Sequence, residues 1–141
     1  EAVIRKIGKS IEAAQKSIFS ITPWKELTQW LFMLDKSWNK ALMRGINVRW
    51  ITDKPQNGYS SLENIEVILK NPHFKHKIMP NSPKKRVGIF DCKEVYVATL
   101  EESDAAESPA LWTDNSTVTH ILKDYFEMNW KLSKEYKIER Q

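Results

Sequence analysis

The sequence predicts an α/β domain in which a mixed sheet is flanked by helices, in the order α-β-α-β-α-β-β-β-β-α. Two observations lead to this class. Short runs rich in valine, isoleucine and aromatic residues alternate with longer segments whose apolar residues recur every three or four positions. Later in the chain, two short runs follow each other across a turn, which indicates an antiparallel hairpin beside the parallel strands of a βαβ unit.

The first element is an amphipathic helix over residues 2–16. Ile4, Ile7, Ile11 and Ala14 recur at steps of three and four, which makes a narrow apolar seam. Such a seam suits a helix that lies on a sheet. It also suits a signalling coiled coil, although about two heptads fall short of the three or four that this structure needs. Residues 17–22 then form a short strand.

A long helix follows, from Trp24 to Gly45. We expect Thr22 to be its N-cap, with Pro23 at the first helical position, because both residue types favour these places. Gly45 is a natural terminator in the left-handed conformation. The helix either packs on two sides or presents an oligomer contact, because apolar residues also lie off its main stripe: Trp30, Phe32 and Met33.

The next strand, over residues 47–52, completes a βαβ unit, so its two strands should be parallel neighbours or near neighbours with a right-handed crossover. Residues 53–58 form a polar loop at the carboxyl end of that strand. Open α/β sheets bind ligands at such ends. A helix over residues 60–70 stops at Asn71-Pro72, and a third strand covers residues 74–79.

The last part of the chain contains the hairpin. Residues 80–83 form a rigid turn, and Val87, Ile89, Val95 and Val97 alternate along two strands that a turn at residues 91–94 connects. Residues 101–109 are acidic and rich in small residues, so we expect an exposed, mobile loop. A strand over residues 110–114 precedes a helix that residues 114–116 cap. We expect this helix to continue through residues 131–141, because no terminator follows.

Composition limits the class of protein. The 141 residues, 41% of them hydrophobic, suit one domain over 1–141, which we expect to be a fragment of a larger protein. No apolar run reaches the roughly 18–20 residues of a membrane span, and no signal-peptide pattern opens the chain. A single cysteine, Cys92, fits a reducing compartment, so we expect a cytoplasmic domain without membrane contact. The net charge of +4 permits an anionic ligand without requiring nucleic acid.

Patterns for metal binding and catalysis are weak. His73, His76 and His120 are the only imidazoles, and the first two would point to opposite faces of a strand, so we expect no metal site. Ser116 and His120 could touch at a helix start, but no third group orients them. Four glycines form no phosphate-binding loop. We therefore expect no cofactor.

The densest positive charge, Lys84, Lys85 and Arg86, lies just before the hairpin. Lysines can protect an edge strand from unwanted pairing. Alternatively, the guanidinium of Arg86 binds a carboxylate or phosphate through two N–H groups, and Lys84 adds a positive charge on the same strand face. Tryptophans at predicted strand ends could stack a sugar ring or base, although such tryptophans more often belong to the core. The candidate ligand-binding residues are Thr22, Trp24, Asp53, Lys84, Arg86, Trp112 and Asn115.

The spacing Lys84-x-Arg86-x-x-x-x-Asp91 resembles the H-x-K-x-x-x-x-D motif of the phospholipase D superfamily, which also lies on a strand that enters a hairpin. Lysine stands in place of the family's histidine, and arginine in place of its lysine. That histidine attacks phosphorus to form a covalent intermediate. A lysine with a reference pKa of about 10.4 cannot replace the imidazole without a large shift. The resemblance implies a phospholipase-D-like fold that lacks the catalytic residues.

Almost the whole chain is similar to the effector domain of archaeal TrmB-type sugar-sensing regulators. In that family the domain follows a winged-helix DNA-binding module, binds a small effector and shifts the affinity of the dimer for DNA. The resemblance also extends to domains that serve as sensors ahead of histidine kinases. The similarity implies a homodimer that binds an anionic or sugar-like effector and meets DNA only through an attached domain. The matching segments are Ile11–Ile18, Thr22-Pro23, Arg44–Arg49, Ile89–Glu94, Leu111–Asn115 and Tyr125–Trp130.

We therefore expect a non-catalytic sensor or regulatory domain of an archaeal transcriptional regulator or signal-transduction protein. One alternative is the sensor domain of a histidine kinase. A divergent phosphodiesterase with a replaced nucleophile and a pure dimerisation module are two others. Direct DNA contact through residues 84–86 is a further alternative, which predicts a steep loss of affinity with salt.

Overall fold

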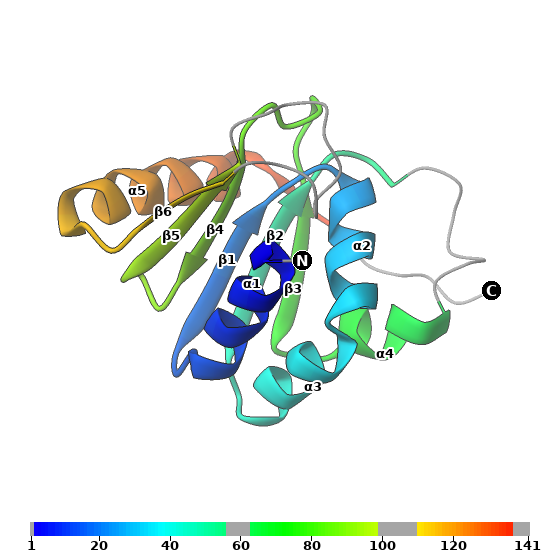
Figure 1. Ribbon diagram of the computed structural model, residues 1–141. Coiled ribbons are helices and arrows are strands. Elements are labelled where there is room, and N and C mark those ends of the chain that lie inside the picture. The colour runs from blue at the N-terminus through cyan, green and yellow to red at the C-terminus, as the bar shows by residue number, and fades with distance from the viewer. Residues whose placement is uncertain (1, 56–62, 99–109, 137–141) are drawn as a thin grey trace.

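The computed structural model describes residues 2–55, 63–98 and 110–136, which form a mixed seven-stranded sheet with helices on both faces (Figure 1). The strand order is β6-β5-β4-β1-β2-β3-β7. The strands are β1 Ser17–Ile21, β2 Asn47–Thr52, β3 Phe74–Ile78, β4 Arg86–Phe90, β5 Glu94–Ala98, β6 Ala110–Thr113 and β7 Lys134–Glu135. The helices are α1 Ala2–Ala13, α2 Trp24–Met33, α3 Asp35–Met43, α4 Glu63–Lys70 and α5 Ser116–Leu132.

The strand pairing agrees with the predicted topology. β1 pairs with β2 and β2 with β3 in parallel, as expected for successive βαβ units. β4 pairs antiparallel with β1 on one side and with β5 on the other, which completes the hairpin. The predicted fold class, a mixed sheet flanked by helices, is confirmed.

Two apolar clusters hold the layers together, one on each face of the sheet. Helices α1 to α4 cover one face, where Trp38 and Trp50 are fully buried with ring centroids 5.4 Å apart. Helix α5 covers the other face, where the ring of Phe126 stacks on Phe19 at 4.9 Å. Ile11 of α1 is buried in the first cluster, so this helix lies on the sheet and does not form a coiled coil.

The predicted long helix is wrong, because it is broken into α2 and α3 at Leu34, which has φ −124° and ψ 36°. In a straight helix Trp30 and Trp38 would project about 80° apart. The bend brings both into the same core, where Trp38 Nε1 donates to the carbonyl oxygen of Trp30 at 3.2 Å. Met33 packs against this core as well, whereas Phe32 remains 64% exposed. Gly45, with φ 82°, ends the helical segment as expected.

The predicted N-cap of α2 is also wrong. The N-cap position is Pro23, and no side chain at this position caps the helix. The carboxylate of Asp53 does so from the end of β2, since Trp24 N–H donates to Asp53 Oδ1 at 2.7 Å. Asn115 caps α5 as expected and accepts from the backbone N–H groups of Thr117 and Val118.

The expected continuation of the last helix is wrong, because α5 ends at Leu132. The Ser133 hydroxyl donates to the carbonyl oxygen of Asn129 at 2.7 Å, and its backbone is extended. The chain then forms β7, which pairs antiparallel with the edge of β3. This strand gives hydrogen-bond partners to backbone groups at the edge of β3, which a further helical turn in solvent would not reach. Predicted structure over residues 56–62, 99–109 and 137–141 lies outside the described residues.

Within the described ranges, none of the helices combines the length and the apolar character that crossing a bilayer requires.

The turn between β4 and β5 contains a strained residue. Asp91 and Cys92 both have φ 56°, in the left-handed region, and Lys93 N–H closes the turn by donating to the carbonyl oxygen of Phe90. A side chain with a Cβ atom costs about 1–2 kcal/mol in this conformation. Aspartate tolerates it better than cysteine does.

Replacing Cys92 with glycine is expected to stabilise the protein by about 0.5–1 kcal/mol, because glycine adopts positive φ without steric cost. The midpoint of urea unfolding measures this gain. Cys92→Ala is the matched control, since it removes the thiol but keeps the Cβ atom. Equal stability of the two variants would show that the turn stores no such strain.

Candidate functional site

The first candidate site surrounds Arg86, at the start of β4. Its side chain is 3% exposed, and its Nε lies 2.7 Å from Oε2 of Glu26, a buried residue of α2. β4 lies between β5 and β1, so the interpretation of this segment as a protected sheet edge is wrong. A charge pair removed from water in this way requires close partners. We call this buried pair the Arg86 centre.

Polar side chains surround the Arg86 centre. Ser20 and Thr22 are buried beside it, and Trp50 Nε1 donates to Thr22 Oγ1 at 2.8 Å. Burial, with Glu26 adding to it and Arg86 opposing it, raises the pKa of Tyr96 to about 12. The cavity between these groups measures about 20 Å³. A space of this size admits a water molecule but no organic ligand.

The other residues of the Lys84-x-Arg86-x-x-x-x-Asp91 motif lie apart from this centre. Lys84 is exposed and precedes β4, so it does not share a strand face with Arg86. Asp91 lies in the hairpin turn, where its carboxylate accepts from the N–H groups of Gln15, Lys16 and Ser17. Burial raises the pKa of Asp91, but these hydrogen bonds outweigh that effect and lower it below its usual value. Asp91 therefore anchors the connection between α1 and β1.

The predicted candidates do not gather in one place. Thr22 and Arg86 meet at the Arg86 centre. Asp53 holds the start of α2, next to Trp24. Trp112 packs edge-on against Tyr96 at 5.1 Å, with Lys6 Nζ 4.7 Å from its ring centre. The candidates therefore lie in several places: the Arg86 centre, the start of α2, the side of β5 that carries Tyr96, and the N-cap of α5.

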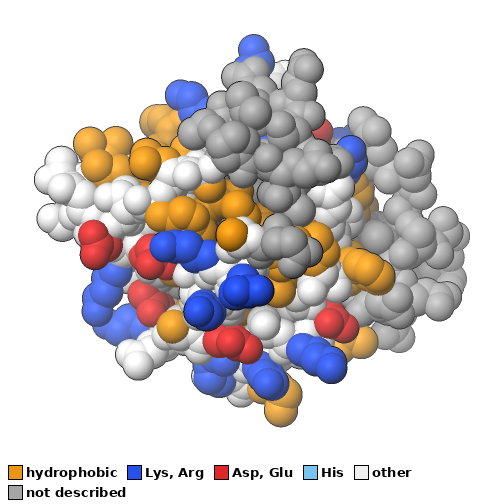
Figure 2. Space-filling model, in the orientation of Figure 1, with side chains coloured by type: hydrophobic (Ala, Val, Ile, Leu, Met, Phe, Trp, Pro, Cys, Tyr) orange, Lys and Arg blue, Asp and Glu red, His pale blue; other side chains and the backbone are white. Residues whose placement is uncertain are grey.

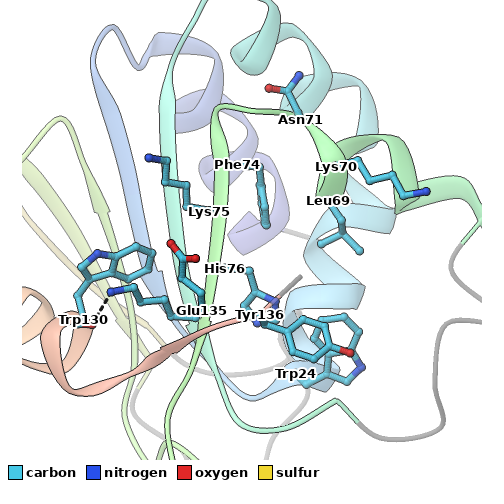
Figure 3. A pocket seen from close by; sticks show the side chains of 11 residues that line it. Trp24, Leu69, Lys70, Asn71, Phe74, Lys75, His76, Trp130, Glu135 and Tyr136 are labelled. Carbon is cyan, nitrogen blue, oxygen red and sulfur yellow. Dashed lines mark hydrogen bonds between the residues drawn. The ribbon is translucent and has the colours of Figure 1, made fainter. Parts of the chain in front are cut away.

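A second, larger candidate site lies along the edge of β3 (Figure 3). It is a cavity of about 370 Å³, which we call the β3 pocket. Its lining comes from α2, the end of α4, β3, the end of α5 and β7. The lining residues are Trp24, Leu69, Lys70, Asn71, Phe74, Lys75, His76, Lys77, Trp130, Glu135 and Tyr136.

His76 is the most constrained polar residue of the β3 pocket. It is 9% exposed, its Nε2 lies 2.7 Å from Thr52 Oγ1, and its ring stacks on Trp24 at 5.5 Å. Tyr136 meets the imidazole edge-on at 5.4 Å, and Figure 3 shows these three rings side by side. Burial lowers the pKa of His76 to about 4. The imidazole is therefore neutral at physiological pH.

Basic residues line the other side of the pocket, on the face of β3 that carries α5. Lys77 Nζ donates to the carbonyl oxygen of Trp130 at 3.1 Å and lies 4.5 Å from the centre of its indole ring. Lys75, next to it on this face, is exposed. Glu135 is the cross-strand partner of Lys77, so it lies on this face as well. The pocket therefore has an aromatic side and a charged side, which carries two lysines and one glutamate.

Of the residues that line this pocket, the sequence predicts only Trp24 as a ligand-binding residue. The sequence pattern places His76 among the weak metal-ligand candidates and Tyr136 in a helical extension. One signal does point to the pocket: Phe74 and His76 alternate with lysines along the third strand, which predicts a histidine on the buried face. Among the described residues, no three histidine, cysteine, aspartate or glutamate side chains lie close enough together to hold a metal ion.

Comparisons with known proteins identify the fold. No protein-family model and no curated protein matches the sequence. Among solved structures, NucT from Helicobacter pylori matches with a TM-score of 0.73 at 18% identity, covering 96% of this chain and 91% of that chain. Nuc from Salmonella typhimurium, a phospholipase D family member, matches with a TM-score of 0.64 at 18% identity, covering 94% of this chain and 90% of that one.

A third solved structure is TrmBL2, described as an archaeal chromatin protein with a novel mode of DNA binding. It matches with a TM-score of 0.71 at 18% identity over 95% of this chain and 50% of that chain. The chain thus spans half the length of this neighbour. Together these likenesses show that the fold is phospholipase-D-like, as the motif spacing implied.

Proposed function

We propose that this chain is a non-catalytic regulatory domain that binds a small-molecule effector. The observation that carries the proposal is the Arg86 centre. A phosphodiesterase of this fold needs an imidazole and an open anion site at this place. Here the arginine is buried against Glu26, and the neighbouring cavity has room only for water.

The positions of the histidines support the same proposal. The sequence has three, of which His73 and His120 are exposed. His76 lies on β3, and two strands, β2 and β1, separate β3 from β4. His73 precedes β3, and His120 follows Thr119, whose hydroxyl donates to the carbonyl oxygen of Lys93 in the turn beyond the far end of β4 from Arg86. These positions support the absence of a histidine nucleophile beside Arg86.

The regulatory part of the proposal draws on the likeness to TrmBL2, half of whose length this chain spans. We propose that this chain is a domain of an archaeal transcriptional or signalling regulator of the TrmB type, whose effector acts through an attached output module, either a DNA-binding domain or a kinase. Figure 2 shows acidic side chains among the basic ones on the face that carries α1, so this face has no dominant basic patch among its described residues. A dominant basic patch is typical of nucleic-acid-binding surfaces.

Two assays test the proposal. The intact protein, Lys84→Ala and Lys84→His are expected to release no product from bis(p-nitrophenyl) phosphate or single-stranded DNA. Separately, at least one member of a panel of sugars, nucleotides and organic acids is expected to raise the melting temperature of the intact protein by about 5–10 °C at a hundredfold excess over its dissociation constant. Hydrolysis by the unmodified protein that disappears in Lys84→Ala would refute the non-catalytic assignment.

A dimerisation module is a second candidate function, because α5 exposes Ile121, Met128 and Leu132. Met128 follows Ile121 by seven positions and Leu132 follows Met128 by four, so the three residues lie along one side of the helix. A homodimer covers such a surface. Light scattering separates the two functions: a stable dimer together with no thermal shift from any compound would favour dimerisation alone.

A further inference from the structure

The β3 pocket contains a histidine whose proton can be placed. Thr52 Oγ1 carries one hydrogen, which it donates to the carbonyl oxygen of Asp53 at 2.7 Å. At its 2.7 Å contact with His76 Nε2 the hydroxyl must therefore accept. His76 thus carries its proton on Nε2, and Nδ1 keeps a lone pair that meets no hydrogen-bond donor among the described residues.

The backbone of β3 carries a second acceptor that no described residue engages. Val48 N–H donates to the carbonyl oxygen of His73, and Met79 N–H donates to the carbonyl oxygen of Thr52. The backbone N–H and C=O groups of the odd-numbered residues of β3 therefore point towards β2. The backbone groups of the even-numbered residues point towards the opposite edge of β3, where Tyr136 N–H donates to the carbonyl oxygen of His76 at 3.0 Å. The carbonyl of Phe74 also points to this edge, two residues beyond the pairing with the described part of β7.

On the other side of the pocket, two lysines outnumber one carboxylate, which favours an anionic group there. Lys75 and Lys77 project from the face of β3 opposite to His76, because neighbouring residues of a strand alternate. Lys77 is held over Trp130, whereas Lys75 is exposed and forms no ion pair with a described carboxylate. Lys70 pairs with Glu66 on α4. Glu135, the one carboxylate among the described lining residues, lies opposite Lys77 on the same face, so one lysine charge remains in excess there.

We propose that the β3 pocket binds a nucleoside monophosphate whose base carries an amino group. The inference rests on the proposed effector-binding function and names its site and ligand class. The amino group donates to His76 Nδ1 and to the carbonyl of Phe74, the planar base lies on the aromatic side, and the phosphate reaches Lys75 and Lys77. The cavity of about 370 Å³ lies within the range of roughly 300–1,000 Å³ that small-molecule sites occupy.

Simpler ligands use only part of this site. A neutral sugar or nucleoside places no anion beside Lys75 and Lys77. Inorganic phosphate brings no planar ring to the aromatic side, which Phe74, His76 and Tyr136 form. Only a ligand with both parts uses the acceptors, the rings and the lysines together.

Titration calorimetry on the intact protein at low salt tests the inference with adenosine monophosphate as the probe. We expect one site per chain. Adenosine, which lacks the phosphate, and purine riboside monophosphate, which lacks the amino group, are each expected to bind about three- to tenfold more weakly. Equal affinity for purine riboside monophosphate would overturn the assignment of the two acceptors.

Variants locate the site. Lys75→Gln is expected to weaken adenosine monophosphate by about three- to tenfold and to leave adenosine unchanged. Lys9→Gln, on the exposed side of α1, is the matched control and is expected to change neither. A loss in Lys84→Gln in place of Lys75→Gln would move the anion site to the segment before β4 and overturn the inference. Failure of every nucleoside monophosphate to bind would also overturn it, while a thermal shift with another compound would leave the proposed function intact.

Discussion

Replacing Arg86 with methionine is expected to destabilise the protein by about 3–5 kcal/mol, the largest loss that we expect from any single substitution. The guanidinium and the Glu26 carboxylate are both buried, with Nε and Oε2 2.7 Å apart. Methionine fills similar space but leaves the carboxylate without its cationic partner in the interior. Urea unfolding at pH 7, with the slope checked for two-state behaviour, measures the loss.

Two further variants separate the charge effect from packing. Arg5→Met makes the same chemical change at an exposed position of α1 and is expected to alter stability by no more than about 0.5 kcal/mol. The double variant Arg86→Met/Glu26→Leu is expected to recover most of the loss, because it removes both buried charges. If Arg86→Met were no less stable than Arg5→Met, the buried pair would contribute nothing to stability, and the description of the centre as closed would fail.

Lowering the pH from 6.5 to 4 is expected to reduce the free energy of unfolding by about 3 kcal/mol through His76 alone. Its pKa is about 4 in the folded protein against 6.5 in the unfolded chain, and each pKa unit corresponds to about 1.4 kcal/mol. As the pH falls from 6.5 to 4, the unfolded chain binds a proton that the buried imidazole does not. The stabilising contribution is therefore complete above pH 6.5 and is lost progressively towards pH 4.

The control is His76→Gln, which keeps a donor for Thr52 but does not titrate. Lys75, Lys77 and Glu135 line the same pocket and are present in both proteins, so the difference between the two stability curves isolates His76. Parallel curves for His76→Gln and the unmodified protein between pH 4 and 6.5 would contradict the burial of a neutral imidazole.

The candidate site depends on tertiary contacts more than the fold does. The spacing of Lys84, Arg86 and Asp91 in the sequence led correctly to the phospholipase-D-like fold. The same spacing could not reveal that Glu26, sixty residues away in sequence, forms a buried ion pair with Arg86. The β3 pocket was missed for the same reason, since Trp24, His76 and Tyr136 come from three separate parts of the chain.

The sequence by itself determined the strands β1 to β6, the parallel βαβ units, the hairpin and the Asn115 and Gly45 caps. These depend on periodicity and on residues close in the chain. Only the tertiary structure decided the bend at Leu34, the end of α5 at Leu132 and the pairing of β7 with β3. Each of these exchanges local helical hydrogen bonds for core burial or strand pairing, and those gains come from partners that are distant in sequence.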